Sequence, residues 1–269
     1  MREPVMTEPE ILVRLDKVSK AFGDVKVLDC LDLEVRRGEN VAVLGQSGSG
    51  KSVLLKLIIG LLELDDGEIH LWGQPIRSLS EEEMGPLRRR MGFLFQSGAL
   101  FDSMSVFDNV AFPLVENGYT GDDADLEGRV EQLLEWVDLP GTGSKRPSEL
   151  SGGMRKRVAL ARTLAVRPEL ILYDEATTGL DPVTGRRISC LIRDTAKRLN
   201  STSIVVTHDV DCARTVADRW TFLHGGRILA DGTPSELFES RDPEVQAFLA
   251  PWAPTAGAAD SANPVERMN

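Results

Sequence analysis

Apolar residues follow two spacings along the chain, and each spacing predicts a different kind of element. Short continuous apolar runs are typical of strands buried on both faces, as in a parallel sheet. Stretches with an apolar residue every three or four positions predict amphipathic helices. The runs lie at 41–44, 91–95, 170–173 and 203–207, and helices are expected at 53–59, from about 106, at 122–138, after 151–153 and at 183–199. Because runs and helices alternate, we predict an α/β fold.

Apolar positions before the first of these runs and after the last of them predict antiparallel strands. Residues 11–18 and 25–35 surround a turn at 22–24 and fit two antiparallel strands. Residues 220–223 and 227–230 surround two glycines and predict a second hairpin. Further elements are expected as a strand at 68–72, a solvated helix at 79–90 and closing helices near 234–239 and 243–249.

The same pattern divides the chain into three segments. Residues 1–9 are acidic, contain proline and have no apolar signal core, which predicts a flexible N-terminus. Residues 10–250 hold all the predicted elements and would form one domain, in which about 97–167 is a helical insertion. Residues 251–269 are rich in Pro, Ala, Ser and Asn, so we expect a loosely ordered tail.

The charge balance excludes some classes of partner. Aspartate plus glutamate number 42 against 31 lysine plus arginine, which gives a net charge of −11. A protein that holds nucleic acid by its phosphates needs the opposite balance, and an anionic membrane surface would repel this chain. No run approaches the roughly 20 apolar residues of a membrane-spanning helix. Any membrane attachment is therefore expected to come through a protein partner.

Cysteine usage points to a reducing compartment. Cys30, Cys190 and Cys212 are scattered singly and show neither metal-ligand spacing nor an even disulfide set. We expect them to be small core fillers in a cytosolic protein.

A glycine-rich loop joins the apolar run at 41–44 to the helix at 53–59. It matches the nucleotide-binding pattern G-x-x-x-x-G-K-[ST] in the strand-to-helix context that the pattern needs. Its glycines would take unusual φ angles and bring N–H groups close to a polyphosphate. Lys51 would reach the β- and γ-phosphates, and Ser52 would offer a hydroxyl to Mg²⁺. The loop consists of Gly45, Gln46, Ser47, Gly48, Ser49, Gly50, Lys51 and Ser52.

Polar groups suited to phosphoryl transfer follow three of the predicted buried strands. Gln96 follows the second run, Asp174 and Glu175 follow the third, and His208 follows the fourth. Asp174 is expected to hold Mg²⁺, and Glu175 to orient and deprotonate a water molecule. Ligands of open α/β sheets bind at the carboxyl ends of the strands, so we expect these groups to meet the phosphate loop.

Two further features could contact a nucleotide. Ser151, Gly152 and Gly153 stand at a predicted helix N-terminus, where a hydroxyl and bare N–H groups form a second candidate anion site. The alternative is a plain helix cap. Phe22 lies on the first hairpin turn, where its ring could stack on adenine; the alternative is a core or staple residue.

With Leu150 to Gly153 standing between the phosphate loop and the two carboxylates, the chain resembles the ATP-binding cassette (ABC) family over about residues 11–240. The resemblance implies a P-loop NTPase (RecA-like) core with an antiparallel β subdomain and an inserted α-helical signature subdomain. The motifs stand in the family's order as Phe22 (A-loop), 45–52 (Walker A), Gln96 (Q-loop), 150–154 (signature), 170–175 (Walker B), 179–182 (D-loop) and His208 (switch histidine).

The resemblance also implies ATP and Mg²⁺ as cofactors and ATP hydrolysis as the reaction. Family members work as head-to-tail pairs, so the signature of one copy would close on the γ-phosphate held by Walker A of the other. The implied catalytic residues are Lys51, Gln96, Glu175 and His208, and the implied metal ligands are Ser52, Gln96 and Asp174. The implied nucleotide contacts are Phe22, residues 45–52, Ser151, Gly152, Gly153 and Asp181.

Two departures from the wider family are similar to the MlaF-type ATPases of Mla and Mce lipid-transport systems. The signature continues as Met154-Arg155-Lys156-Arg157, where glutamines are usual. The segment 97–115 is rich in large apolar residues, and in the family this region receives a cytoplasmic helix of a membrane permease. The resemblance thus implies a lipid-moving permease, an Mce-domain partner and a peripheral place on the cytoplasmic face of the inner membrane. It also implies a C-terminal tail that packs on the neighbouring subunit.

Three alternatives stay open on the sequence alone. The ATPase could energise transport of a molecule other than lipid, since the cassette touches ATP and the permease but not the cargo. It could act in translation or DNA repair, although such proteins typically carry two cassettes, a coiled-coil insertion or zinc-binding cysteines, and the sequence shows none of these. It could also be a scaffold that binds ATP and hydrolyses it negligibly.

Overall fold

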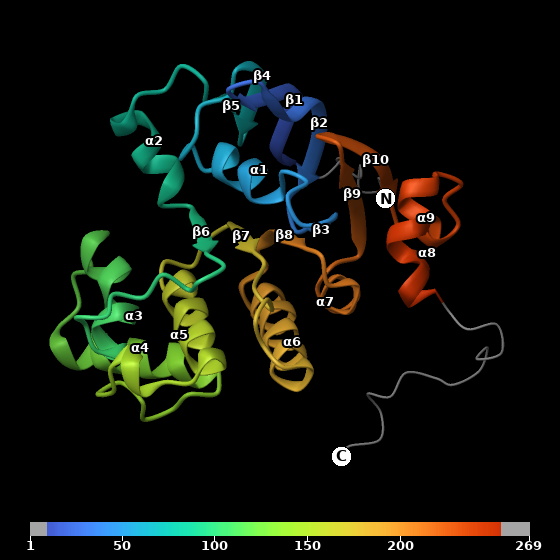
Figure 1. The fold of residues 1–269 in the computed structure, drawn as a ribbon. Helices are drawn as coiled ribbons and strands as arrows, with labels where there is room; N and C mark the ends of the chain where they lie inside the picture. Colours follow the sequence, from blue (N-terminus) through green and yellow to red (C-terminus); the bar gives the residue numbers. More distant parts are fainter. Residues whose placement is uncertain (1–9, 254–269) are drawn as a thin grey trace, which may run out of the picture.

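The computed structural model describes residues 10–253, within which the strands form two sheets (Figure 1). The larger sheet has six strands in the order β10-β9-β3-β8-β7-β6. Five of them run parallel, and β10 pairs antiparallel with β9 at one edge. Their bounds are β3 (Asn40–Leu44), β6 (Met91–Leu94), β7 (Leu170–Asp174), β8 (Thr202–Thr207), β9 (Arg219–His224) and β10 (Arg227–Gly232). The predicted α/β fold around a parallel sheet is confirmed.

The smaller sheet is antiparallel, with the order β2-β1-β4-β5. Its strands are β1 (Ile11–Phe22), β2 (Val25–Arg36), β4 (Asp66–Leu71) and β5 (Gln74–Pro75). β1 extends four residues beyond the predicted end at 18, because its pairing with β2 continues to Phe22 opposite Val25. The turn is therefore only Gly23-Asp24, and Gly23 supplies the positive φ of 59° that a two-residue hairpin needs.

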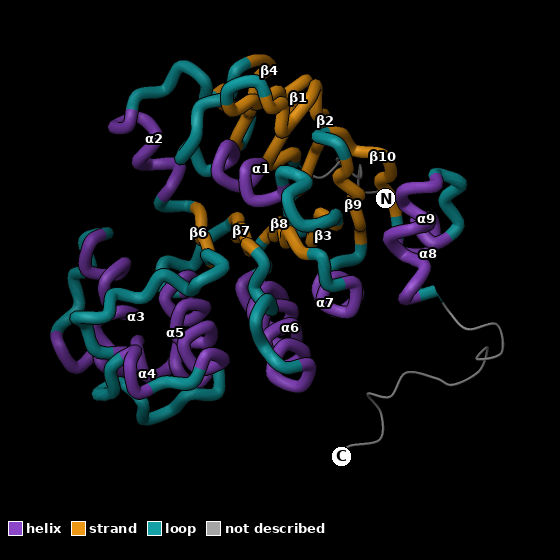
Figure 2. Tube along the Cα trace, in the orientation of Figure 1, coloured by secondary structure: helices purple, strands orange, loops and turns teal. Residues whose placement is uncertain are grey.

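Alternate side chains of the buried strands face two different hydrophobic cores. In β7, Leu170 and Leu172 belong to one core, whereas Ile171 and Tyr173 belong to the other. The first core lies between the large sheet, the small sheet and α1 (Lys51–Ile58). The second lies under α5 (Gly152–Leu164), α6 (Pro182–Leu199) and α7 (Val210–Val216), and Figure 2 shows these helices on one side of the strands. Full burial of a leucine or isoleucine side chain contributes about 1.5–3 kcal/mol, so residues on both faces hold β7 in place.

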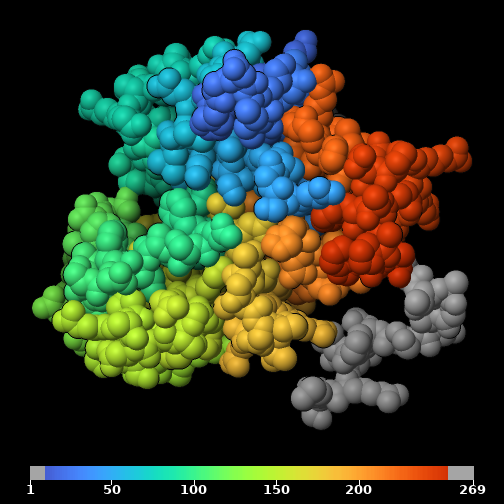
Figure 3. All heavy atoms as spheres, viewed as in Figure 1, coloured from blue at the N-terminus to red at the C-terminus, as the bar shows by residue number. Residues whose placement is uncertain are grey.

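A helical insertion connects β6 to β7, which are neighbours in the sheet. It contains α3 (Val106–Glu116), α4 (Asp123–Trp136), the 3₁₀ turn η1 (Pro147–Glu149) and α5, and Figure 3 shows it as a lobe beside the rest of the molecule. The Ser105 hydroxyl accepts the Asp108 N–H (3.0 Å) and caps α3, which begins at the predicted position of about 106. The expected helical insertion at about 97–167 is thus present between the two strands.

The remaining helices cover the edges. α2 (Glu81–Arg88) is shorter than the predicted 79–90 because Ser80 caps it in a capping box with Glu83. α8 (Pro234–Phe238) and α9 (Pro243–Leu249) close the domain as expected. α7 was not predicted, because seven residues give too few turns for a clear apolar period.

Described structure continues past the predicted domain end at 250. Ala250–Trp252 form the 3₁₀ turn η2, and the Trp252 ring lies 6.1 Å from that of Phe248. The flexible segment predicted for 1–9 and the tail from 254 to 269 lie outside the described residues. Among residues 10–253, no helix is long and apolar enough to cross a membrane.

Candidate active site

The order of the parallel strands brings the predicted site residues to one edge of the sheet. β3, β8, β7 and β6 are consecutive neighbours, and the phosphate loop, His208, Asp174-Glu175 and Gln96 follow them in that order. Parallel strands present all their carboxyl ends at the same edge. The predicted meeting of these groups is therefore a consequence of strand order.

The phosphate loop contains two glycines with positive φ and a third glycine that packs directly against the backbone of β9. Gly48 and Gly50 have φ of 82° and 101°, and Gly50 is the N-cap of α1. The expectation of an unusual φ is wrong for Gly45, which is not among the positive-φ glycines. A Cβ on Gly45 would instead lie within 3.0 Å of the Leu223 carbonyl oxygen, so β9 passes too close for any side chain.

Lys51 is buried at the base of this loop. Its Nζ donates to the carbonyl oxygens of Gly45 and Gln46, both at 2.8 Å, and lies 3.5 Å from Glu175 Oε1. Burial lowers the pKa of the ammonium, and the carboxylates of Glu175 and Asp174 act in the opposite direction. The ammonium thus joins the loop to the carboxylates at the end of β7, where a phosphate held by the loop N–H groups would meet it.

Ser52 and Asp174 form the pair that fits a magnesium ion. The Ser52 hydroxyl donates to Asp174 Oδ1 at 2.7 Å, and both are hard oxygen donors of the type that Mg²⁺ prefers. Gln96 and Asp174 line one cavity of about 490 Å³. Among residues 10–253 there is no group of three or more His, Cys, Asp and Glu side chains suited to a metal. Ser52, Asp174 and Gln96 are the residues of this site that could hold Mg²⁺.

Glu175 is buried and held from several directions. Its Oε2 accepts the Thr178 hydroxyl at 3.0 Å and lies 2.8 Å from Nδ1 of His208, whose side chain is half exposed. Its backbone has φ of 49°, in the left-handed region that costs a non-glycine residue about 1–3 kcal/mol. Strain of this kind persists where surrounding contacts impose it, and here those contacts aim one carboxylate toward the phosphate loop.

The sequence did not indicate two of the groups that touch Glu175. Thr178 donates through its hydroxyl, and Lys156 of α5 donates from Nζ to the Glu175 carbonyl oxygen at 3.3 Å. Thr178 has no motif of its own, although its place three residues after Glu175 in a turn is a usable signal. Lys156 was noticed only as a departure from a glutamine.

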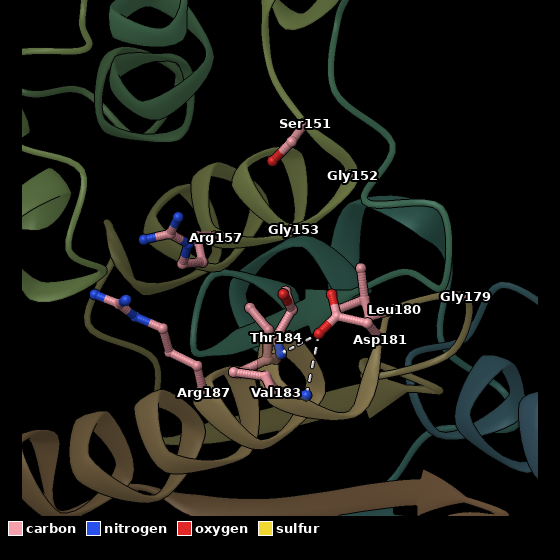
Figure 4. A pocket seen from close by; sticks show the side chains of 11 residues that line it. Ser151, Gly152, Gly153, Arg157, Gly179, Leu180, Asp181, Val183, Thr184 and Arg187 are labelled. Carbon is pink, nitrogen blue, oxygen red and sulfur yellow. Dashed lines mark hydrogen bonds between the residues drawn. The ribbon is translucent and has the colours of Figure 1, made fainter.

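The second candidate anion site lies in a separate cavity of about 460 Å³ (Figure 4). Ser151 caps α5 by accepting the Met154 N–H at 3.3 Å, and its neighbours Gly152 and Gly153 line the same cavity. Asp181 caps α6 by accepting the N–H groups of Val183 and Thr184, as the dashed lines show. The cavity lining shares no residue with the phosphate loop, so within residues 10–253 one chain keeps the two anion sites apart.

Phe22 is exposed at the end of β1, opposite Val25 at the start of β2. Its side chain is 48% accessible, and Lys20 Nζ lies 5.5 Å from the ring centre. The start of β2 runs along the end of the loop, since a Cβ on Gly50 would lie 3.0 Å from the Val27 carbonyl oxygen. The alternative of a core aromatic is therefore wrong, while the stacking of this ring on adenine stays a prediction.

Comparison with known proteins agrees with this geometry. A model of the "ABC transporter" family matches residues 28–178. The intermembrane phospholipid transport system ATP-binding protein MlaF of Haemophilus influenzae is 44% identical over 238 residues, covering 88% of this chain and 90% of that protein. The methionine import ATP-binding protein MetN of Rhizobium johnstonii is 40% identical and covers 89% of this chain, which spans 66% of MetN.

Solved structures match in the same way. The ATP-binding cassette MJ0796, in a dimeric post-hydrolysis state bound to ADP and Pi, has a TM-score of 0.76 and 31% identity, covering 82% of this chain and 98% of that one. The cbiO1 protein of Clostridium perfringens has a TM-score of 0.77 and 30% identity, and the match covers 89% of this chain and 94% of cbiO1. The chain belongs to the ABC transporter family and is the ATP-hydrolysing subunit of such a transporter.

Proposed function

We propose that this ATPase powers a membrane permease that moves phospholipid or a related lipid. The observation that carries the proposal is the match to MlaF, which is named for intermembrane phospholipid transport and is covered over 90% of its length. MetN is named for methionine import and is nearly as similar, but the chain spans only 66% of it. The signature continuation Met154-Arg155-Lys156-Arg157 adds support from the sequence.

Each site residue has a role that its contacts support. The phosphate loop and Lys51 bind and orient the β- and γ-phosphates of ATP. Ser52, Asp174 and Gln96 would hold Mg²⁺, which supplies charge neutralisation on the phosphates when it is bound. Glu175 accepts a proton from the attacking water, and His208, 2.8 Å from its carboxylate, keeps that carboxylate aimed.

The separation of the two anion sites supports a head-to-tail dimer. Ser151, Gly153 and Asp181 face a cavity that no phosphate loop of the same chain reaches. A second copy turned head to tail would bring its loop to this cavity, and ATP would then bridge the copies. MJ0796, which shares the fold, is dimeric in two solved states.

The segment after Gln96 offers a surface for the permease. Phe101 is 42% accessible, and its ring lies 5.0 Å from that of Phe112 on α3. Arg162 of α5 donates to the carbonyl oxygens of Gly98 and Ala99, both at 2.9 Å, and so fixes the segment to the signature helix. A permease helix seated there would hold the ATPase peripherally on the cytoplasmic face of the inner membrane, with an Mce-domain protein as a further partner.

The proposal is tested with the full chain and its membrane permease. The complex is reconstituted into proteoliposomes, and ATP-dependent movement of labelled phospholipid is measured against uptake of labelled methionine. Lipid movement that requires ATP supports the proposal. Methionine uptake without lipid movement would instead establish the second candidate, amino-acid import, which the similarity to MetN favours.

The permease surface is tested by Phe101→Ala. Loss of the exposed ring is expected to weaken association with the permease about thirtyfold, the scale of one interface hot spot. Turnover of the isolated ATPase should stay unchanged. Leu229→Ala, which removes an exposed apolar side chain on β10, is the matched control and should bind like the unaltered chain. Equal binding by both variants would remove Phe101 from the interface.

A further inference from the structure

Lys156 is a buried charged residue that has no part in the steps of ATP hydrolysis proposed above. It lies on the signature helix α5 with 7% of its surface exposed. Burial lowers the pKa of its ammonium, and the negative charges of Glu175 and Asp174 oppose that shift. A buried ammonium needs a hydrogen-bond acceptor, and the one it has is the Glu175 carbonyl oxygen. The glutamine usual in the wider family would end one bond earlier and carry no charge.

The contact of Lys156 is with the backbone of the catalytic carboxylate. Its Nζ donates to the Glu175 carbonyl oxygen at 3.3 Å, and the Thr178 N–H donates to the same oxygen at 3.1 Å. A carbonyl oxygen has two lone pairs, so both bonds can form. The Glu175 N–H donates to Val206 of β8 at 3.0 Å. Thus β8 holds one side of this strained residue, and α5 and its own turn hold the other.

This arrangement ties the catalytic carboxylate to the helix that carries the signature. Ser151 and Gly153 lie at the N-terminus of α5, and Lys156 lies on the same helix less than two turns later. A shift of α5 therefore moves the ammonium relative to Glu175. We propose that Lys156 is a positioning residue: its bond to the Glu175 carbonyl fixes the direction of the catalytic carboxylate and makes that direction depend on where the signature helix lies.

The inference rests on the proposed role of Glu175 as the base and is independent of the cargo. A positioning role needs a donor of sufficient length at residue 156, whereas a packing role needs only a side chain of similar volume. Lys156→Met keeps the volume and removes the donor, and Lys156→Arg keeps the donor and the charge. The two substitutions therefore separate the two roles.

The experiment measures turnover, KM for ATP and melting temperature of the full chain. Lys156→Met is expected to lower kcat about tenfold or more, as a displaced catalytic group does, with KM within about twofold. Lys156→Arg should retain clearly more turnover than Lys156→Met. Lys197→Gln, which removes an exposed charge at the end of α6, is the control for net charge and should act like the unaltered chain.

Other outcomes overturn the inference. Unchanged kcat in Lys156→Met, or equal losses in the Met and Arg variants together with a lower melting temperature, would leave Lys156 a packing residue. If Lys156→Met does not fold, Lys156→Gln is compared with Lys156→Arg by the same criteria. Glu175→Gln is measured beside them: if it keeps full turnover, the role of Glu175 fails, and if it is inactive while Lys156 variants are normal, only this inference fails.

Discussion

The two anion sites of this chain are built on different principles. The phosphate-loop site is charged and internally bonded: Lys51, Ser52, Asp174 and Glu175 already contact one another or nearby carbonyls. The signature site is a cavity whose contribution to a phosphate would be N–H groups, a hydroxyl and space. The first site therefore contains the charged groups suited to catalysis, and the second contains neutral hydrogen-bond donors around an open cavity. The head-to-tail dimer proposed above would bring the two kinds of site to one nucleotide.

The largest effect is expected at the charged site. Glu175→Gln keeps the size of the side chain and removes the base, so turnover should fall at least about a hundredfold, the lower end for loss of a general base. ATP binding, measured with a fluorescent nucleotide, should persist. Because the nucleotide is bound and not cleaved, the dimer should accumulate on a sizing column. Turnover close to the original value would show that chemistry does not reside at this site.

A smaller effect is expected at the signature site. A Cβ on Gly153 would lie 2.5 Å from Thr184 Cγ2, so Gly153→Ala must move the Thr184 side chain or shift α5 against α6. We expect turnover to fall about tenfold, with ATP affinity of the isolated chain unchanged, because the phosphate loop is untouched.

Gly128→Ala provides the control for that substitution. Gly128 lies inside α4 with no atom within 4 Å of an added Cβ, so alanine should leave turnover unchanged and stabilise the helix by roughly 0.5–1 kcal/mol. If Gly153→Ala behaved like Gly128→Ala, the signature cavity would not need its close fit.

The smallest effect is expected at the opposite end of β7, where charge serves stability alone. Hydrogen bonds from Arg90 and Arg37 lower the pKa of Glu169 from its ordinary 4.5 to about 2. Glu169→Gln should cost about 1 kcal/mol at pH 7, the scale of a partly exposed ion pair. Its turnover at saturating ATP should be unchanged.

The pH dependence of that cost follows from the sign of the shift. A carboxyl whose folded pKa is depressed stabilises the fold above its unfolded pKa and loses that contribution as pH falls toward the folded value. The stability gap between Glu169→Gln and the unaltered chain should therefore be full above about pH 5 and close between pH 4.5 and pH 2. Urea denaturation at several pH values measures it, with exposed Glu63→Gln as the control. A gap that stays constant with pH would contradict the assignment.

The contrast between the two sites also separates what the sequence could and could not predict. The charged site was predictable because it depends on chain topology: Gln96, Asp174 and His208 each end a buried strand, and parallel strands end together. The Ser151 cap was predictable because it is local. The contact from Lys156 to Glu175 was not, since it depends on how α5 is rotated against the sheet.

Backbone exceptions mark the other limit of sequence reasoning. Glu175 has a left-handed φ, which a glutamate in a sequence does not predict. Position 45 requires glycine because a Cβ there would clash with the Leu223 carbonyl oxygen, whereas an unusual φ was expected from the sequence. The pairing of β1 with β2 continues to Phe22 through register shifts between Leu15 and Ala21, and these shifts hide the extension from an alternation pattern. In each case a tertiary contact overrides the local signal.

The two-sided burial of β7 has a consequence for how this family can tolerate changes in length. Its residues alternate between two cores, so deleting or adding one residue within the strand would exchange the faces of everything that follows. Asp174 and Glu175 would trade places with respect to the phosphate loop in the same event. Length variation among relatives should therefore be confined to loops such as 117–122 between α3 and α4. The five-residue length of β7 should stay constant, because it sets the positions of Asp174 and Glu175 relative to the phosphate loop.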